Sequence, residues 1–172
     1  MVAYLPTRYP DPLAGTGAKS LRFGRWPAFG VVYLGSTFRV AFVKTLVRDR
    51  GDGRTGPLLI AYSEIAELNV ARVKNMDMLD LVDLFGSGSL KIGAPSDVAR
   101  ASDQRLARQW SDAFHKRRRI DGVHYPSRLI GEANIAVYDR ALGKLATVDV
   151  GPLTTRHALL GAVLEELSVD VI

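Results

Sequence analysis

The sequence predicts an α+β fold in which a single domain spans residues 1–172. Segments typical of strands and segments typical of helices follow one another without the regular strand–helix–strand rhythm of a doubly wound sheet. A chain of 172 residues is the size of one domain, and 47% hydrophobic residues are enough to build its core. No internal repeat or low-complexity tract divides the sequence.

The N-terminal part of the chain predicts a loop, a strand and a helix. Residues 10–30 are rich in glycine and proline, which indicates an ordered loop. Residues 31–34 are Val-Val-Tyr-Leu, which is typical of a short buried strand. Ser36 is placed to cap a helix over residues 37–48. The apolar face of that helix would carry Val40, Phe42, Val43, Leu46 and Val47.

The rest of the chain predicts several strands and two longer helices. Extended segments are expected at residues 58–62, 67–73, 79–84, 135–138 and 145–148. Ser102 is placed to cap a helix that runs to about Arg118. Residues 155–167 have the clearest helical pattern, and their apolar stripe indicates a face that packs in the core or at an interface. The stripe consists of Leu159, Leu160, Val163, Leu164 and Leu167.

Composition excludes several kinds of protein. The sequence has no cysteine, so it forms no disulfide framework and no thiolate metal site. Its three histidines are scattered without metal-ligand spacing, and we expect no bound metal. No apolar run approaches the roughly 18 residues of a membrane span, and the first residues lack the pattern of a signal peptide. We therefore expect a cytoplasmic protein without membrane contact.

The net charge of +5 favours an anionic partner, such as a nucleotide, an acidic protein or a nucleic acid. The densest basic run spans residues 115–119 and has two interpretations. It is either a solvated helix end whose charges complement the helix dipole, or a patch that binds nucleic acid. No aromatic residues interleave with the run, and the chain shows no helix-turn-helix, RNA-recognition or zinc pattern. Both observations favour the solvated helix end.

Residues 121–128, with the sequence Asp-Gly-Val-His-Tyr-Pro-Ser-Arg, are the most informative stretch and predict a stiff loop. Gly122 permits backbone angles closed to other residues, and Pro126 fixes its own φ. The loop would present Ser127 and Arg128 at its end. A hydroxyl beside a guanidinium suits an anionic or sugar-phosphate ligand. The alternative is an ordinary turn with a solvated Ser-Arg pair.

The order of these segments carries more information than any one of them. A glycine-rich, basic segment ends in Leu-Arg-Phe at residues 21–23, and a strand with Tyr33 follows. Ala-Phe-Val-Lys-Thr-Leu at residues 41–46 comes next, and residues 121–128 come later. This arrangement resembles the RES-domain family, which is named for its Arg, Glu and Ser. The resemblance covers roughly residues 4–142.

The resemblance implies a fold, an activity and a partner. It implies mixed β-sheets flanked by helices, arranged as in ADP-ribosyltransferases. It also implies the toxin of a bacterial toxin–antitoxin pair that consumes NAD as its substrate. The reaction would be cleavage of the nicotinamide–ribose bond or transfer of ADP-ribose to a host protein. The partner would be an Xre-like antitoxin, and nucleic acid would be contacted only through that antitoxin.

The resemblance also implies which residues act. Arg22 matches the family's Arg, Tyr33 matches the Tyr on the nicotinamide side, and Ser127 matches the Ser. Arg8 matches an earlier Arg of the family. Arg22, together with Arg8 or Arg25, would hold the diphosphate, Tyr33 would stack on a flat heterocycle, and Ser127 completes the expected NAD-binding residues. Arg22, Lys44 and Ser127 occupy the catalytic positions.

Lys44 is a departure from the family, because it stands where the resemblance calls for Glu. A carboxylate there would accept a hydrogen bond from the ribose and stabilise a developing oxocarbenium ion, whereas an ammonium offers only donors. Loss of one such electrostatic contribution typically slows a reaction by about 10²–10³. We therefore expect an impaired toxin. The alternative is a catalytically silent module that keeps only its NAD pocket or its antitoxin-binding face.

Overall fold

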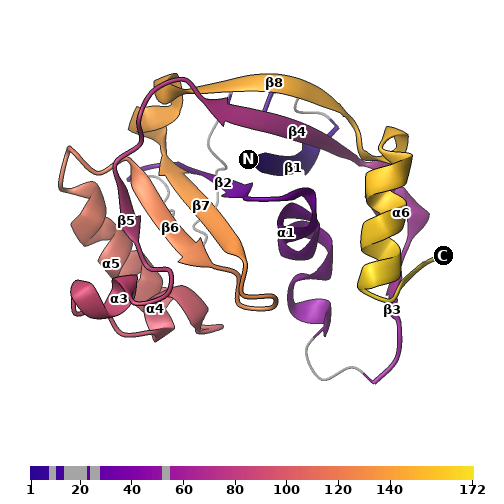
Figure 1. Ribbon diagram of the computed structural model, residues 1–172, viewed down its shortest axis with the longest axis horizontal. Helices are drawn as coiled ribbons and strands as arrows, with labels where there is room; N and C mark the ends of the chain where they lie inside the picture. Colours follow the sequence, from indigo (N-terminus) through magenta and orange to yellow (C-terminus); the bar gives the residue numbers. More distant parts are fainter. Residues whose placement is uncertain (8–10, 14–22, 24–27, 52–54) are drawn as a thin grey trace.

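The computed structural model describes residues 1–7, 11–13, 23, 28–51 and 55–172. These residues form a seven-stranded mixed sheet, a two-stranded parallel sheet and surrounding helices, which confirms the predicted α+β class (Figure 1). None of the helices in these ranges is long and apolar enough to cross a bilayer.

The large sheet has the strand order β5-β6-β7-β2-β1-β4-β8, in which only β5 and β6 run parallel. Its strands are β1 (Val2–Pro6), β2 (Val31–Gly35), β4 (Leu68–Asn75), β5 (Leu81–Asp83), β6 (Gly122–Pro126), β7 (Ala133–Tyr138) and β8 (Leu145–Pro152). The small sheet pairs β3 (Leu58–Ile60) with β9 (Val169–Val171).

The large sheet divides into two arms at its middle. β2 pairs with β7 along its whole length, and β1 pairs with β4 along its whole length, but β1 meets β2 only where Val2 pairs with Gly35. We call β5, β6, β7 and β2 the first arm, and β1, β4 and β8 the second arm. In Figure 1, β4 and β8 run across the top of the molecule, and β5, β6 and β7 descend on the left.

The helices cover the two arms separately. Helices α3 (Gly88–Lys91), α4 (Asp97–Arg100) and α5 (Arg105–His115) gather beside the first arm, and α6 (His157–Glu166) lies at the far end of the second arm (Figure 1). Helix α1 (Phe38–Phe42) lies between these groups and continues into the π-helix η1 (Val43–Val47) and the short turn η2 (Arg48–Gly51). The remaining helical segments are α2 (Tyr62–Ala66), η3 (Asp139–Lys144) and η4 (Leu153–Thr155).

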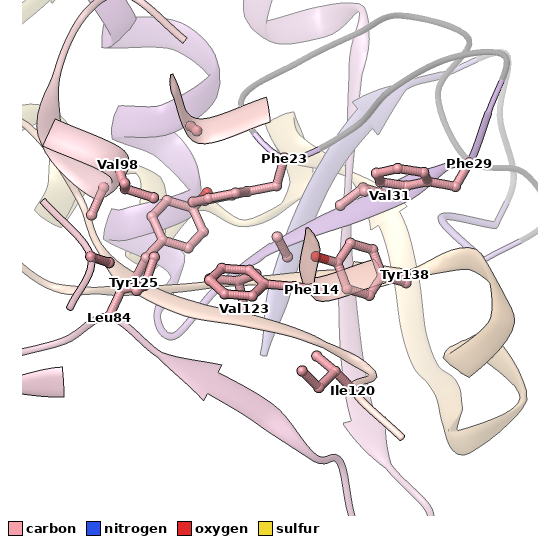
Figure 2. Packing of buried hydrophobic residues seen from close by; sticks show 14 residues of the cluster. Phe23, Phe29, Val31, Leu84, Val98, Phe114, Ile120, Val123, Tyr125 and Tyr138 are labelled. Atoms are coloured by element: carbon pink, nitrogen blue, oxygen red, sulfur yellow. The ribbon is translucent and has the colours of Figure 1, made fainter. Parts of the chain in front are cut away.

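The core between the first arm and α5 is rich in aromatic rings. Figure 2 shows Phe23, Phe29, Phe114 and Tyr138 packed with aliphatic side chains of the same cluster. Tyr138 is fully buried, and its hydroxyl lies 2.9 Å from the buried Ser111 Oγ, which in turn donates to the Phe23 carbonyl. Burial raises the pKa of Tyr138 to about 12. This network ties Phe23 to α5 through Ser111 and to the end of β7 through Tyr138.

Helix α1 packs between the two arms, beside the place where they meet. Thr37, not the expected Ser36, caps it by accepting a hydrogen bond from the Val40 N–H at 3.2 Å. The ring of Tyr4 on β1 contacts Phe38 and Phe42 edge to face, with centroid separations of 5.4 and 6.4 Å. The chain therefore leaves β2, turns sharply and packs back against the neighbouring arm.

Several predicted elements differ from the observed ones. The predicted loop over residues 121–128 is wrong, because residues 122–126 form β6, held between β5 and β7. Residue 62 belongs to a helix and not to the preceding strand. The predicted helix over residues 37–48 is observed as an α-helix that changes to π-helical hydrogen bonding at Val43. β1, α2, α3 and α4 were not predicted, because each is too short for a clear period.

The predicted helix near the C-terminus is observed, and its apolar stripe mostly faces the core. Val163 is buried, and Leu160, Leu164 and Leu167 pack partly buried against the cluster under the second arm. Leu159 differs, because 53% of it is exposed.

Gly35→Ala is expected to destabilise the fold. A Cβ at this position would lie 2.7 Å from the Ala41 backbone nitrogen, so α1 would have to shift away from the junction of the arms. We expect the free energy of unfolding to fall by about 1–3 kcal/mol in denaturant titrations. Gly161→Ala is the matched control, because a Cβ there meets no described atom within 4 Å. Because Gly161 lies within α6, Gly161→Ala should raise the free energy of unfolding by up to about 1 kcal/mol. Equal effects at the two glycines would contradict this account of the junction.

Candidate functional site

A cavity of about 220 Å³ lies between η1 and the first arm. Its walls come from β2, η1, η2, the α4–α5 region, the end of β6 with the following turn, and β7. The lining residues are Tyr33, Val43, Lys44, Arg48, Ala99, Gln104, Tyr125, Pro126, Ser127, Arg128, Leu129 and Asn134. Three residues predicted to form the site, Tyr33, Lys44 and Ser127, thus line one cavity although 94 positions separate the first from the last.

Strand register places three of the lining side chains on one face of the sheet. Tyr33 pairs with Ala136, and Tyr125 pairs with Asn134, two residues earlier on β7. Because side chains alternate between the faces of a strand, positions two apart on β7 share a face, as do the residues directly opposite them. Tyr33, Tyr125 and Asn134 therefore lie together on the face that borders the cavity.

Lys44 extends from the π-helix toward the two tyrosines. Its Nζ donates a hydrogen bond to the Tyr125 hydroxyl oxygen. The same atom lies 4.4 Å from the centre of the Tyr33 ring and 5.1 Å from the centre of the Tyr125 ring, within the range of cation–π contacts. π-helical turns are rare and occur frequently at functional sites. The ammonium of Lys44 is thus held against two aromatic faces.

Both tyrosine rings are fixed by Phe23. The Tyr33 hydroxyl accepts a hydrogen bond from the Phe23 N–H at 2.7 Å. Tyr125 is only 2% exposed, and its ring meets the Phe23 ring edge to face with centroids 4.8 Å apart. The aromatic wall of the cavity is therefore built before any ligand binds.

Ser127 and Arg128 begin the tight turn from β6 to β7. The Ser127 N–H donates to the Glu132 carbonyl at 2.6 Å, and the Ser127 carbonyl accepts from the Gly131 N–H at 2.9 Å. Gly131 has a φ of 71°, which favours glycine. The Glu132 carboxylate forms an ion pair with Arg39 of α1, so the turn is tied to the helix that leads to Lys44.

The first residue of the stretch 121–128, Asp121, has a structural role. Asp121 is buried and accepts hydrogen bonds from the Lys144 Nζ at 2.7 Å and from the Asp80 N–H at 2.8 Å. The hydrogen bond to Asp121 raises the pKa of Lys144 above its ordinary value. Asp121 therefore anchors the start of β6 and does not line the cavity.

Arg48 adds a second cation to the cavity from a strained position. Its φ of 43° is unusual for a residue other than glycine, and such backbone outliers concentrate at functional sites. Its Nε donates to the Lys44 carbonyl at 3.1 Å. The charged side chains among the described lining residues are those of Lys44, Arg48 and Arg128, and all three are cationic.

Asn134 is a lining residue that was missed at the level of sequence. It is 2% exposed, and its Oδ1 has no hydrogen-bond partner among the described residues. A buried, unsatisfied carbonyl is costly unless a ligand or water supplies a donor. The signal in the sequence was a single Asn within the apolar strand at residues 133–138. Tyr125 and Arg48 were also not predicted as site residues.

Two of the predicted site residues, Arg8 and Arg22, lie outside the described residues. Their predicted contact with a diphosphate therefore stays a prediction. The described residues contain no group of three or more histidine, aspartate or glutamate side chains that could hold a metal ion.

Comparison with known proteins identifies the family. A sequence model of the RES domain matches residues 3–156. The chain belongs to the RES-domain family. A curated relative named "probable toxin y4kH", from Sinorhizobium fredii, is 37% identical over 127 residues, which cover 73% of this chain and all of the relative. The resemblance expected from residues 4–142 is thereby confirmed, and the match extends further toward the C-terminus.

A solved structure shows the same fold. The MbcT–MbcA toxin–antitoxin complex of M. tuberculosis contains a chain that matches this RES-domain protein with a TM-score of 0.71 and 16% identity. The match covers 93% of this chain and 87% of that chain. This likeness shows that the two chains share one fold, and it confirms the predicted arrangement of mixed sheets flanked by helices.

Asn134→Leu tests whether Asn134 serves a ligand or the fold. Because the substitution removes an unsatisfied buried carbonyl, we expect the free energy of unfolding to stay within about 1 kcal/mol of the wild type or to rise. We also expect binding of NAD and related nucleotides, measured by calorimetry, to weaken about tenfold, which corresponds to one lost hydrogen bond. A loss of stability above about 2 kcal/mol, with affinity unchanged, would show that Asn134 is structural.

Proposed function

We propose that this RES-domain protein is the toxin of a bacterial toxin–antitoxin pair that acts on NAD, and that Lys44 keeps its activity low. The observation that carries the proposal is the single cavity lined by Tyr33, Lys44 and Ser127. The RES-domain match and the relative named as a probable toxin support the toxin assignment. The reaction is NAD cleavage or transfer of ADP-ribose to a host protein.

The chemistry of the cavity fits one half of NAD. Tyr33 supplies an aromatic ring suited to a flat heterocycle, and the guanidiniums of Arg48 and Arg128 suit phosphate oxygens. Asn134 also lines the cavity, and its side-chain amide can donate to or accept from an amide or hydroxyl group. A volume of about 220 Å³ lies below the about 300–1,000 Å³ typical of small-molecule sites, so the cavity holds a ring and its sugar, with the rest of the dinucleotide outside.

Lys44 opposes the reaction by its charge. Cleavage of the nicotinamide–ribose bond makes the ribose more positive, and a carboxylate at position 44 would favour that change. The ammonium of Lys44 disfavours it and already donates to the Tyr125 hydroxyl. Ser127, at the start of its turn, lines the same cavity and would contact the substrate there.

A second candidate is a catalytically silent module that binds NAD or an antitoxin. The contacts of Lys44 favour it, because the ammonium is accommodated between Tyr33 and Tyr125 and is not simply exposed. Nicotinamide release by the Lys44→Glu variant separates the two candidates. A carboxylate at position 44 should restore the reaction in an impaired toxin, whereas a catalytically silent module should stay inactive.

We also propose an Xre-like antitoxin as the partner, through which any contact with nucleic acid would occur. Support comes from the similar fold in the MbcT–MbcA toxin–antitoxin complex. The net charge of +5 suits a partner with an acidic surface, since complementary charge speeds association. We expect this partner to cover the mouth of the cavity.

Lys44→Glu is expected to restore NAD cleavage. The wild-type chain should release little or no nicotinamide, and Lys44→Glu should raise the rate by at least about 10² because it reverses an unfavourable charge. Free nicotinamide measured by chromatography tests both statements, and growth arrest of the host is a second readout. The exposed Lys91 provides a matched control, because Lys91→Glu makes the same charge change outside the cavity.

Two results would contradict this account of position 44. Nicotinamide release by the wild type at an ordinary enzymatic rate would show that Lys44 does not impair the site. A folded Lys44→Glu protein that neither releases nicotinamide nor modifies any host protein would show that the catalytic assignment is wrong. Adding Ser127→Ala to Lys44→Glu should remove most of the restored activity, while adding it to Lys91→Glu should change nothing measurable.

Co-expression with the product of the adjacent gene tests the partner. We expect the two proteins to elute together in size-exclusion chromatography and the complex to weaken as salt rises, because the attraction is partly electrostatic. The partner should also lower nicotinamide release by Lys44→Glu. Independent elution of the two proteins at low salt would count against an antitoxin encoded by that gene.

A further inference from the structure

The ammonium of Lys44 takes up an aromatic surface that a ligand ring would otherwise use. Its Nζ lies 4.4 Å from the centre of the Tyr33 ring and 5.1 Å from that of the Tyr125 ring. The face of an aromatic ring is electron-rich and attracts cations. A positively charged heterocycle entering the cavity would compete with Lys44 for the same faces and would be repelled by its charge.

The position of this ammonium is set by the surrounding structure. Lys44 donates to the Tyr125 hydroxyl, and Tyr125 is 2% exposed. Phe23 holds both rings, through a hydrogen bond to the Tyr33 hydroxyl and an edge-to-face contact with Tyr125. Moving the charge out of the cavity would therefore break a hydrogen bond and two cation–π contacts.

The other charges around the cavity reinforce this effect. Arg48 and Arg128 line it together with Lys44, and none of the described lining residues is acidic. Like charges that line one concave surface add up, and low-dielectric walls reduce their screening by solvent. The cavity consequently favours anionic groups and disfavours cationic ones.

We infer that the cavity selects nucleotides by the charge of the ring that enters it. The cavity binds phosphate-bearing nucleotides in which this ring is neutral or absent, and it discriminates against nucleotides in which the ring is positively charged. Oxidised NAD carries a positive nicotinamide ring, reduced NADH carries a neutral one of nearly the same shape, and ADP-ribose carries none. This inference rests on the proposed function, since it assumes that the cavity receives the nicotinamide end of the dinucleotide.

Calorimetric titration of the wild-type chain with NAD⁺, NADH and ADP-ribose tests the inference without any substitution. We expect NADH and ADP-ribose to bind at least about tenfold more tightly than NAD⁺, a difference of about 1.4 kcal/mol. NAD⁺ binding as tightly as NADH, or more tightly, would overturn the inference and leave the proposed function standing. Failure of all three nucleotides to bind would overturn both.

A pair of matched substitutions then tests whether Lys44 is the cause. Lys44→Met keeps an unbranched side chain that is one atom shorter and removes its charge, so the preference for NADH over NAD⁺ should shrink to within about threefold. Lys91→Met makes the same change at an exposed position outside the cavity and should keep the wild-type preference. Thermal unfolding confirms that each variant is folded. An unchanged preference in folded Lys44→Met would overturn the assignment to Lys44.

Discussion

The close approach of Gly35 to the start of α1 is the constraint on which the rest of the structure depends. The two arms of the large sheet meet only where Gly35 pairs with Val2, and the chain must turn there without a Cβ. The same turn directs α1 between the two arms, where Phe38 and Phe42 pack on Tyr4. A side chain at position 35 would press on the backbone of the helix that leads to Lys44, so this contact sets both the shape of the sheet and the position of the site.

The site combines a rigid wall with a cationic one. Tyr33, Tyr125 and Asn134 lie on one face of neighbouring strands, because strand pairing fixes their relative positions. The opposite wall comes from a π-helix and an arginine with positive φ, which are less regular and less favourable conformations. Such a division is common at functional sites, where an ordered scaffold supports a locally strained segment.

Charge distinguishes this site from the one that the RES-domain family leads one to expect. A carboxylate at position 44 would favour positive charge in the cavity, whereas an ammonium favours anions. Because Tyr125 and Tyr33 accommodate that ammonium, the substitution alters the electrostatics of the cavity while keeping its aromatic walls. We therefore propose that position 44 affects both which ligand binds and whether it reacts, and these two properties can be measured separately.

The sequence by itself determined the α+β class, most of the strands and the family, because these depend on local composition, short-range periodicity and the order of motifs. It also singled out Tyr33, Lys44 and Ser127, which the structure brings to one cavity. Only the tertiary structure decided that residues 122–126 form a strand, since that segment is extended through pairing with β5 and β7. The unsatisfied carbonyl of Asn134 likewise became visible only there. Burial and strand pairing arise between residues far apart in the chain, and local propensity contains no information about such contacts.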